Sequence, residues 1–251
     1  MSGIVGVAAH RNVSDIMFEG LRRCDDGYAR WCGLSITDRH GRAQHLQQKG
    51  DLRHLVRSFD CGPFFGGTAI GFLAESPNQA TCVECHWDKA ATAVIIGNMS
   101  APSSSRLRLE CLGHTFRTNS SAELTCALLG HYCKRHESVK TAIDAMLAEL
   151  SGKFALIVLH EREPGTLYCL HHGEPLAIGI GIGEHGVSAR AESLLQITDR
   201  FVWLEEDDTA RVRADAFQVW DGSGEEVKRD IVNYVPSLGR SSSNGSHSPC
   251  L

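Results

Sequence analysis

The hydrophobic and polar positions of the chain change period several times, and each change marks an expected element. Apolar residues recur every three or four positions after Asn12 and Ser14, which is typical of a capped amphipathic helix. Ser120-Ser121-Ala122-Glu123 has the spacing of a capping box before another helix, expected to reach about His136. From Phe154 onward, short apolar runs between turn residues predict strands. The expected strands are 2–9, 32–36, 43–48, 66–72, 93–96, 154–159, 167–170, 176–182, 186–189, 200–204, 209–213 and 216–220, and the expected helices are 12–24, 51–59, 106–112, 120–136 and 138–150.

The order of these elements predicts the fold class. One strand and one helix are followed by several strands, two helices and then many strands, which favours an α+β layered domain over alternating βαβ units. Residues 74–90 show no clear period and are expected to form a long loop. Residues 236–251 are rich in serine and glycine without a core pattern, so we expect one domain over 1–235 and a disordered tail.

Composition narrows the function classes. The 251 residues are 42% hydrophobic and carry a net charge of -5, which gives no electrostatic reason to expect nucleic acid or an anionic membrane as a partner. No apolar run approaches the ~20 residues of a transmembrane helix, and the first one is too short for a secretory signal. The ten cysteines are scattered, so we expect reduced thiols and a cytoplasmic location.

Two local motifs admit a metal or a cofactor. Cys82-Val83-Glu84-Cys85-His86 has the spacing of a haem attachment site, or of part of a zinc site completed by Cys133 or His136. We favour a loop of polar and thiol residues that binds neither group. Haem attachment would need an export signal, and a zinc site would need a fourth coordinating residue at a familiar spacing; the sequence has neither. Gly181 to Gly186 fits G-x-G-x-x-G, but a strand-like stretch follows it, which favours a hairpin turn. We therefore expect no metal and no cofactor.

The first residues offer a nucleophile. A small residue after Met1 allows the initiator methionine to be removed, which places Ser2 at the amino terminus. The Ser2 hydroxyl can then attack a carbonyl carbon while the α-amino group, with an ordinary pKa near ~8, accepts the proton. In the alternative, Met1 is retained and the segment is simply a strand.

The opening Met-Ser-Gly-Ile-Val-Gly, together with Phe18-Glu-Gly-Leu-Arg-Arg23, resembles the class II glutamine amidotransferase domain of glucosamine-6-phosphate synthase. The resemblance extends to about Val235 and includes the family's L-x-G-x-[YF] and L-E-E-G-D stretches. Its further matched stretches are Gly66-Gly-Thr-Ala-Ile-Gly71, Leu150-Ser-Gly-Lys-Phe-Ala155, His172-Gly-Glu-Pro-Leu-Ala-Ile-Gly-Ile-Gly181, Leu204-Glu-Glu-Asp-Asp208 and Glu225-Glu-Val-Lys-Arg229.

The resemblance implies a fold and a set of partners. Members of this N-terminal nucleophile family have a four-layer αββα sandwich, in which two antiparallel sheets face each other between helices. In the synthase, ammonia passes from glutamine to a sugar-phosphate isomerase domain. This chain stops before such a domain, so we expect a stand-alone domain. Its expected partner is a synthase or isomerase-type enzyme, or a small amide substrate.

The resemblance also places the reacting groups, and here the chain departs from the family. Ser2 stands where the family has its nucleophilic cysteine, and serine is the weaker nucleophile at neutral pH. Of the H-N-G motif that binds the oxyanion, Asn98 is kept, whereas Met99 replaces the glycine.

The two charged groups that hold the substrate amino acid are replaced as well. Ala74 stands at the position of the arginine that binds the glutamine carboxylate, and Glu75 beside it would repel that carboxylate. Ser121 stands at the position of the aspartate that binds the ammonium group. Losing one partner of a charged contact costs about 2–5 kcal/mol, so losing both is expected to remove recognition of free glutamine.

Three functions remain open from the sequence. The first is a divergent amidotransferase-like domain that no longer hydrolyses glutamine and acts as a regulatory or structural partner. The second is an amide or ester hydrolase, or an acyl transferase, that uses Ser2 as nucleophile and Asn98 as oxyanion donor on another substrate. The third is a weak glutaminase that supplies ammonia to a separate synthase subunit.

Overall fold

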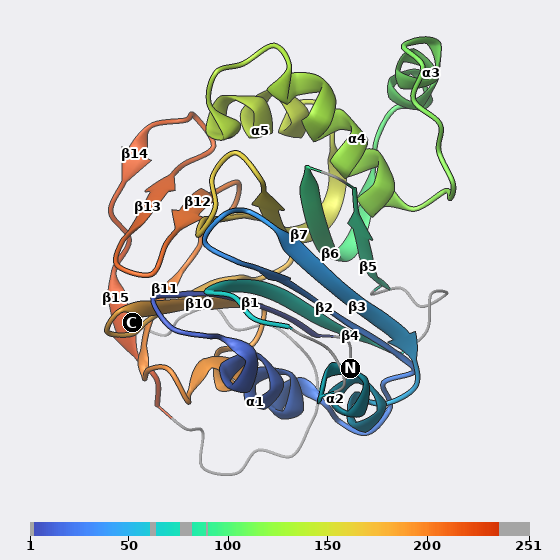
Figure 1. Ribbon diagram of the computed structural model, residues 1–251. Coiled ribbons are helices and arrows are strands. Elements are labelled where there is room, and N and C mark those ends of the chain that lie inside the picture. Colours follow the sequence, from blue (N-terminus) through green and yellow to red (C-terminus); the bar gives the residue numbers. More distant parts are fainter. Residues whose placement is uncertain (1–2, 61–63, 76–81, 89, 236–251) are drawn as a thin grey trace.

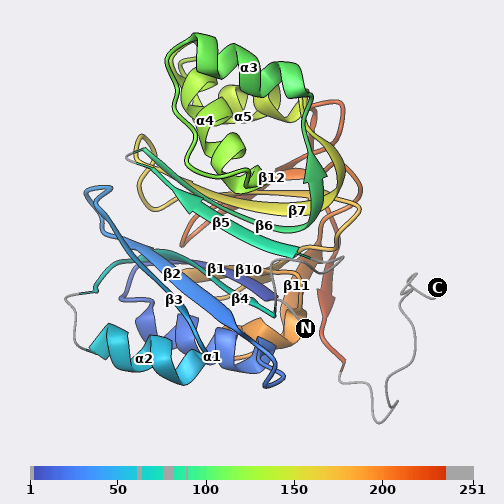
Figure 2. The ribbon, with the colours of Figure 1, turned by 90° about the vertical axis from the view of Figure 1, so that its right-hand side faces the viewer.

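Two antiparallel sheets lie face to face, and helices cover the outer face of each (Figures 1 and 2). The computed structural model describes residues 3–60, 64–75, 82–88 and 90–235. The expected four-layer αββα sandwich of the N-terminal nucleophile type is confirmed in this part of the chain. The expected tail at 236–251 lies outside it.

The first sheet contains the amino-terminal strand near its centre. Its strand order is β15-β11-β9-β10-β1-β4-β2-β3, so β1 pairs with β4 on one side and with β10 on the other. The strands are β1 (Gly3–Ala9), β2 (Trp31–Thr37), β3 (Ala43–Lys49), β4 (Thr68–Ala74), β9 (Ala177–Ile180), β10 (Glu184–Ser188), β11 (Arg200–Trp203) and β15 (Ile231–Asn233).

The second sheet has the order β14-β13-β12-β8-β7-β6-β5. Its edge strand β5 and the edge strand β3 of the first sheet lie on the same side of the sandwich (Figure 1). The strands are β5 (Cys82–Trp87), β6 (Ala91–Ser100), β7 (Ser151–His160), β8 (Leu167–His172), β12 (Thr209–Val212), β13 (Phe217–Trp220) and β14 (Glu226–Val227).

The helices form the two outer layers. Those on the first sheet are α1 (Ser14–Cys24), α2 (Leu52–Asp60) and the short 3-10 helix η1 (Ala191–Leu194), and those on the second are α3 (Ser103–Cys111), α4 (Ser121–Cys133) and α5 (Val139–Leu147). Among the described residues, no helix is both long and apolar enough to cross a membrane.

Three buried clusters correspond to the three interfaces between layers. The middle cluster joins the two sheets and contains Phe72, Ile157 and Ile178, each at most 1% exposed. The outer clusters join each sheet to its own helices. A Cβ atom at Gly33 would lie 2.4 Å from the Phe72 ring, so this glycine makes room for the largest side chain of the middle cluster.

The expected loop over residues 74–90 is wrong in part, because Cys82–Trp87 forms strand β5. Val83 and Cys85 pack against the cluster between the sheets, whereas the Glu84 carboxylate reaches helix α4 on the other face. The strand period of two is therefore present. The sequence does not show this period clearly, because one inward-facing residue is a cysteine and not a typical apolar residue.

Serine caps start α4 and α5 as predicted. The Ser120 hydroxyl accepts hydrogen bonds from the backbone N–H groups of Ala122 and Glu123, and the Ser138 hydroxyl accepts one from Thr141. The capping box is not completed, because the Glu123 carboxylate turns to the loop before the helix instead. Helix α4 also ends at Cys133, three residues before the expected end.

Candidate functional site

Strands β1 and β4 bring the start of the chain next to the lost arginine position. Gly3 pairs with Leu73, and Ala74 follows directly at the end of β4. Ala74 is buried, and its carbonyl oxygen accepts a hydrogen bond from the backbone N–H of Arg30 at 2.8 Å. Glu75 is half-buried beside it. The predicted nucleophile Ser2 lies outside the described residues, so its role stays a prediction.

The end of β6 presents the retained oxyanion residue. Asn98 is exposed and pairs with Lys153 of β7. Gly97 and Gly152 both adopt φ +108°, and a Cβ atom at Gly152 would lie 2.1 Å from the Asn98 carbonyl oxygen. The glycine of the L-x-G-x-[YF] stretch is therefore required by the backbone that carries Asn98.

The Ser121 hydroxyl is hydrogen-bonded to the backbone of Met99. The Met99 side chain is 6% exposed and belongs to the cluster under the helices α3 to α5. The Ser121 hydroxyl donates to the Met99 carbonyl oxygen at 3.1 Å, and the Thr125 hydroxyl contacts the Met99 sulfur at 3.7 Å. The hydroxyl at the position where the resemblance predicts a substrate-binding aspartate is thus hydrogen-bonded to the backbone of β6.

A carboxylate that the sequence analysis missed lies beside Ser121. Glu84 of β5 accepts hydrogen bonds from the Ser120 hydroxyl at 3.0 Å and from the Ala122 backbone N–H at 3.1 Å. Its charge is favourable there because the amino terminus of a helix carries partial positive charge. The only available signal was the alternation of β5, which places Glu84 on the face toward α4.

Glu174 fills the space beside Asn98 that a side chain at position 97 would need. A Cβ atom at Gly97 would lie 2.8 Å from Glu174 Cγ. Burial raises the pKa of Glu174, and Lys153 opposes that rise. The resemblance aligns Gly97 with the histidine of the family's H-N-G motif, and the Glu174 side chain from the β8–β9 turn lies against this glycine.

We refer to Gly3, Ala74, Asn98, Met99 and Ser121 as the Asn98 end of the sandwich. Gly3 and Ala74 come from the first sheet, and the other three come from the second sheet and α4. Ile4, next to Gly3, and Ile96, two positions before Asn98, belong to the same buried cluster between the sheets. The fold therefore places the expected site residues at facing strand ends.

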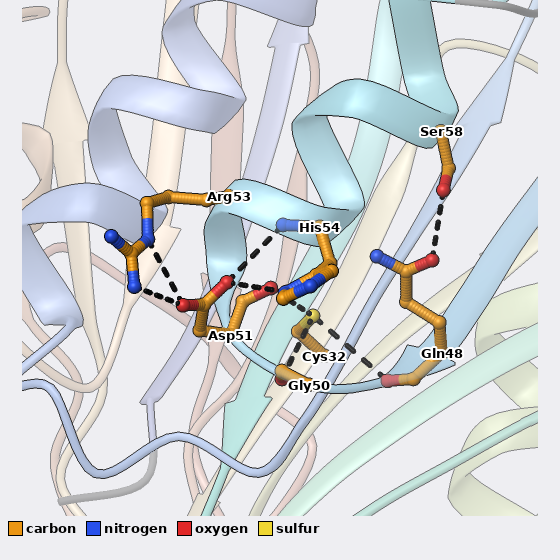
Figure 3. A network of polar contacts seen from close by, with 7 residues as sticks. All are labelled: Cys32, Gln48, Gly50, Asp51, Arg53, His54 and Ser58. Carbon is orange, nitrogen blue, oxygen red and sulfur yellow. Dashed lines mark hydrogen bonds and ion pairs between the residues drawn. The ribbon is translucent and has the colours of Figure 1, made fainter.

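A second set of polar residues resembles a cysteine–histidine–aspartate arrangement but has a structural role (Figure 3). His54 Nδ1 lies 2.8 Å from a carboxylate oxygen of Asp51, which also accepts the His54 backbone N–H at the start of α2. The Cys32 thiol instead contacts the carbonyl oxygens of Gly50 and Asp51 at 3.7 and 3.6 Å. Burial and the nearby Asp51 raise the pKa of Cys32 to about 11, which keeps it a protonated thiol.

The structure does not support the zinc alternative for the Cys82–His86 stretch. Cys85 packs toward the space between the sheets, whereas His86 lies on the other face of β5, and the Cys82 side chain is outside the described set. Among the described residues, one group brings three ligand atoms within 4.8 Å of one another, and it consists of His172, Glu206 and Asp207.

Asp207 in that group has an unusual backbone. Its φ is +63°, a left-handed conformation, at the position where the family's L-E-E-G-D turn has glycine. The aspartate side chain gains a contact there, because one of its oxygens lies 2.5 Å from His172 Nδ1. We regard this pair as part of the turn and not as a site.

Two facing antiparallel sheets between helical layers define the class of the protein as a glutamine amidotransferase-type N-terminal nucleophile fold, and solved structures agree. Glutamine phosphoribosylpyrophosphate amidotransferase from B. subtilis matches with a TM-score of 0.70, at 18% identity, over 89% of this chain and 50% of that chain. A glutamine aminotransferase class-II domain protein from Silicibacter pomeroyi matches with a TM-score of 0.51, at 10% identity, over 93% of this chain and 100% of that chain. No protein-family model matches the chain.

Curated sequences make the relationship more specific. The chain is 31% identical over 238 residues to glutamine–fructose-6-phosphate aminotransferase (isomerizing) of Pseudomonas aeruginosa, and 30% identical over 235 residues to the Escherichia coli K12 protein of that name. These alignments cover 93% and 92% of this chain but 39% of each relative. The chain is thus homologous to the glutaminase domain of glutamine–fructose-6-phosphate aminotransferase, as the sequence resemblance predicted.

Proposed function

We propose that this chain is a class II glutamine amidotransferase-like domain that does not hydrolyse glutamine. It acts as a regulatory or structural partner of a synthase or isomerase-type enzyme. The observation that carries the proposal is the engagement of Ser121, whose hydroxyl donates to the Met99 carbonyl where the family has a free carboxylate for the substrate ammonium. Ala74 at the arginine position is buried and apolar.

The expected energetic consequence is large. Each lost charged contact to a substrate weakens binding by about 2–5 kcal/mol, and two such contacts are replaced here. The Met99 side chain lies in the cluster under the helices, so it adds no new group for an amino acid to bind. A scaffold with this loss retains its outer surfaces, which are what a partner protein recognises.

A weak glutaminase is a second candidate, and two charged residues favour it. The Glu84 carboxylate is hydrogen-bonded to both neighbours of Ser121, so it could stand in for the missing aspartate. The Arg30 backbone N–H donates to the Ala74 carbonyl, so under this candidate the Arg30 guanidinium would replace the missing arginine. Under this candidate, Glu84→Gln would abolish the residual turnover.

Acyl transfer or hydrolysis of another amide or ester by Ser2 is a third candidate. It is favoured by the exposed Asn98, which is held in place by two glycines in a left-handed conformation and remains available as an oxyanion donor. This candidate requires a free Ser2 amine. A measured intact mass that includes Met1 would remove it.

Release of glutamate from L-glutamine, measured on the purified full chain and on the Ser2→Cys variant, tests the proposal. Ser2→Cys restores the stronger nucleophile without restoring the lost charges. We expect neither protein to exceed the rate without protein. Turnover by Ser2→Cys alone would show that the substrate contacts are intact and overturn the proposal, and turnover by the unmodified chain would establish the weak glutaminase.

A further inference from the structure

A large groove lies away from the Asn98 end, where the open edges of both sheets meet. It has a volume of about 1000 Å³, and its lining includes His40 on the β2–β3 turn, His45 on β3, His86 at the end of β5, and His114 on the loop before α4. We call it the histidine groove. Its size is in the range of pockets for small ligands.

Aromatic rings line the groove from both sheets. His45 of β3 stacks on Trp87 of β5, with ring centroids 4.9 Å apart and planes 9° apart, so this pair joins the two edge strands. Burial lowers the pKa of His45 to about 4 and lowers that of His86, so both rings are neutral near pH 7. Neutral, partly buried rings offer flat surfaces on which another ring can stack.

Three guanidinium groups and three carboxylates line the groove. Arg42, Arg117 and Arg162 are all part of the lining. Of the acidic residues in the lining, Asp88 accepts hydrogen bonds from the backbone N–H groups of Ala90 and Ala91. Arg42 pairs with Asp38 at 2.7 Å and Arg162 donates to the Cys133 carbonyl oxygen at 2.6 Å, so Arg117 is the guanidinium group best placed to bind a phosphate or carboxylate.

The wall formed by residues 113–118 is held in place. The Glu123 side chain is buried and accepts hydrogen bonds from the backbone N–H groups of Arg117 and Thr118, both at 2.7 Å. Arg117 and His114 therefore lie on a loop that is already ordered, so ligand binding would lose little conformational entropy there.

An unsatisfied donor lies in a smaller hollow beside the groove. This hollow of about 20 Å³ shares Gly41, Ala43, Asp88 and Glu161 with the groove, and His160 lines it. His160 is 5% exposed, and its Nδ1 accepts a hydrogen bond from the Arg162 backbone N–H. The other ring nitrogen, Nε2, therefore carries the proton, and it has no hydrogen-bond partner in the part of the chain that the structure describes.

We propose that the histidine groove binds a small planar aromatic anion. Its ring would stack among the histidine rings and Trp87, and its phosphate or carboxylate would bind the guanidinium group of Arg117. An oxygen of the ligand, or one water molecule, would occupy the small hollow and accept a hydrogen bond from His160 Nε2–H. This site is separate from the Asn98 end and does not depend on the fate of glutamine hydrolysis.

The test uses three probes on the full chain: 2-naphthyl phosphate, 2-naphthol and inorganic phosphate. Binding is followed by NMR of the histidine ring C–H signals, assigned with single histidine variants. We expect 2-naphthyl phosphate to shift the signals of His86 and His114 and to bind at least about tenfold more tightly than either other probe, because it alone satisfies both the rings and the Arg117 guanidinium group. Arg117→Gln should weaken its binding by about fivefold, the usual scale for one exposed charged contact.

Arg200→Gln is the matched control, since Arg200 is an exposed arginine on β11 in the other half of the first sheet. It should leave the affinity for 2-naphthyl phosphate unchanged. Equal affinities for the three probes, shifts confined to histidines outside the groove such as His10 and His54, or an equal effect of both arginine variants would each overturn the proposal.

Discussion

The two ends of this sandwich use their polar groups in opposite ways. At the Asn98 end, the Ser121 hydroxyl binds the Met99 carbonyl, and the Glu84 carboxylate binds the amino terminus of α4. Beside the histidine groove, the buried donor His160 Nε2 has no partner among the described residues, and rings and guanidinium groups line the groove itself.

This difference shows that residues required by the backbone are kept, whereas residues expected to bind the substrate are not. Gly152 is kept where the backbone needs a glycine, whereas Ser121, at the position where the resemblance places a substrate-binding aspartate, is hydrogen-bonded within the protein. A polar group already bonded within the protein must break that bond to serve a ligand, which offsets most of the gain. Ligand binding is therefore expected at the groove and not at the family's glutamine site.

The largest effect should come from Gly152→Ala, which breaks the geometry of the Asn98 end. The new Cβ atom would meet the Asn98 carbonyl oxygen at 2.1 Å and the residue would keep φ +108°, so we expect a loss of about 3 kcal/mol of unfolding free energy. Gly130→Ala is the control. It lies inside α4 with no atom within 4 Å of the new Cβ and should gain about 0.5–1 kcal/mol. Urea unfolding measures both, and changes of the same sign would contradict the account.

Glu123→Gln should loosen the wall of the groove. Removing the charge from a buried acceptor of two backbone N–H groups costs about 2 kcal/mol at pH 7. Burial raises the pKa of Glu123, but the hydrogen bonds from Thr118 and the Arg117 backbone outweigh it and hold the pKa below the ordinary value.

The lowered pKa fixes the sign of the pH dependence. The unfolded chain binds a proton at Glu123 more readily, so the stabilisation is fully present above the ordinary pKa of 4.5 and is lost as pH falls through the lower folded value. Urea titrations at several pH values should show the unmodified chain and Glu123→Gln converging in acid. Glu110→Gln, at an exposed position of α3, should match the unmodified chain throughout; a constant gap for Glu123→Gln would contradict the assignment.

The smallest effect should come from Ser120→Ala. This change removes the cap of α4 and one hydrogen bond to Glu84, for a loss of about 1 kcal/mol. Ser104→Ala, at an exposed position within α3, should be neutral within about 0.5 kcal/mol. Thermal unfolding of the three proteins would separate them, and equal midpoints would mean that Glu84 does not depend on Ser120.

The fold could be predicted because the sequence features that indicate it act over a few residues or are motifs of a known family. The serine caps at Ser120 and Ser138 act within four residues, and the hairpins follow apolar runs that end in turn residues. Strand β5 escaped prediction because its inner face carries Cys85 beside Val83, and an edge strand needs apolar residues on one face only.

The polar surroundings of the site could be predicted less well, because they depend on contacts that are distant in sequence. Glu84 and Ala122 are 38 positions apart in the sequence, and no motif in either segment predicts that they form a hydrogen bond. The histidine groove is formed by a turn, two edge strands and a loop, and its residues do not belong to any recognisable sequence motif. The replaced positions Ala74, Met99 and Ser121 could be named from the resemblance, but the bond between Ser121 and Met99 required coordinates.

Direct binding of L-glutamine to the full chain tests the central claim most closely, because the claim concerns recognition and not only turnover. Isothermal titration calorimetry with about 10 mM ligand detects any complex with a dissociation constant near 1 mM, which corresponds to about 4 kcal/mol of binding free energy. We predict no saturable binding by the unmodified chain. Saturable binding with a dissociation constant below about 1 mM, weakened by Glu84→Gln, would show that Glu84 replaces the lost aspartate and would contradict the account.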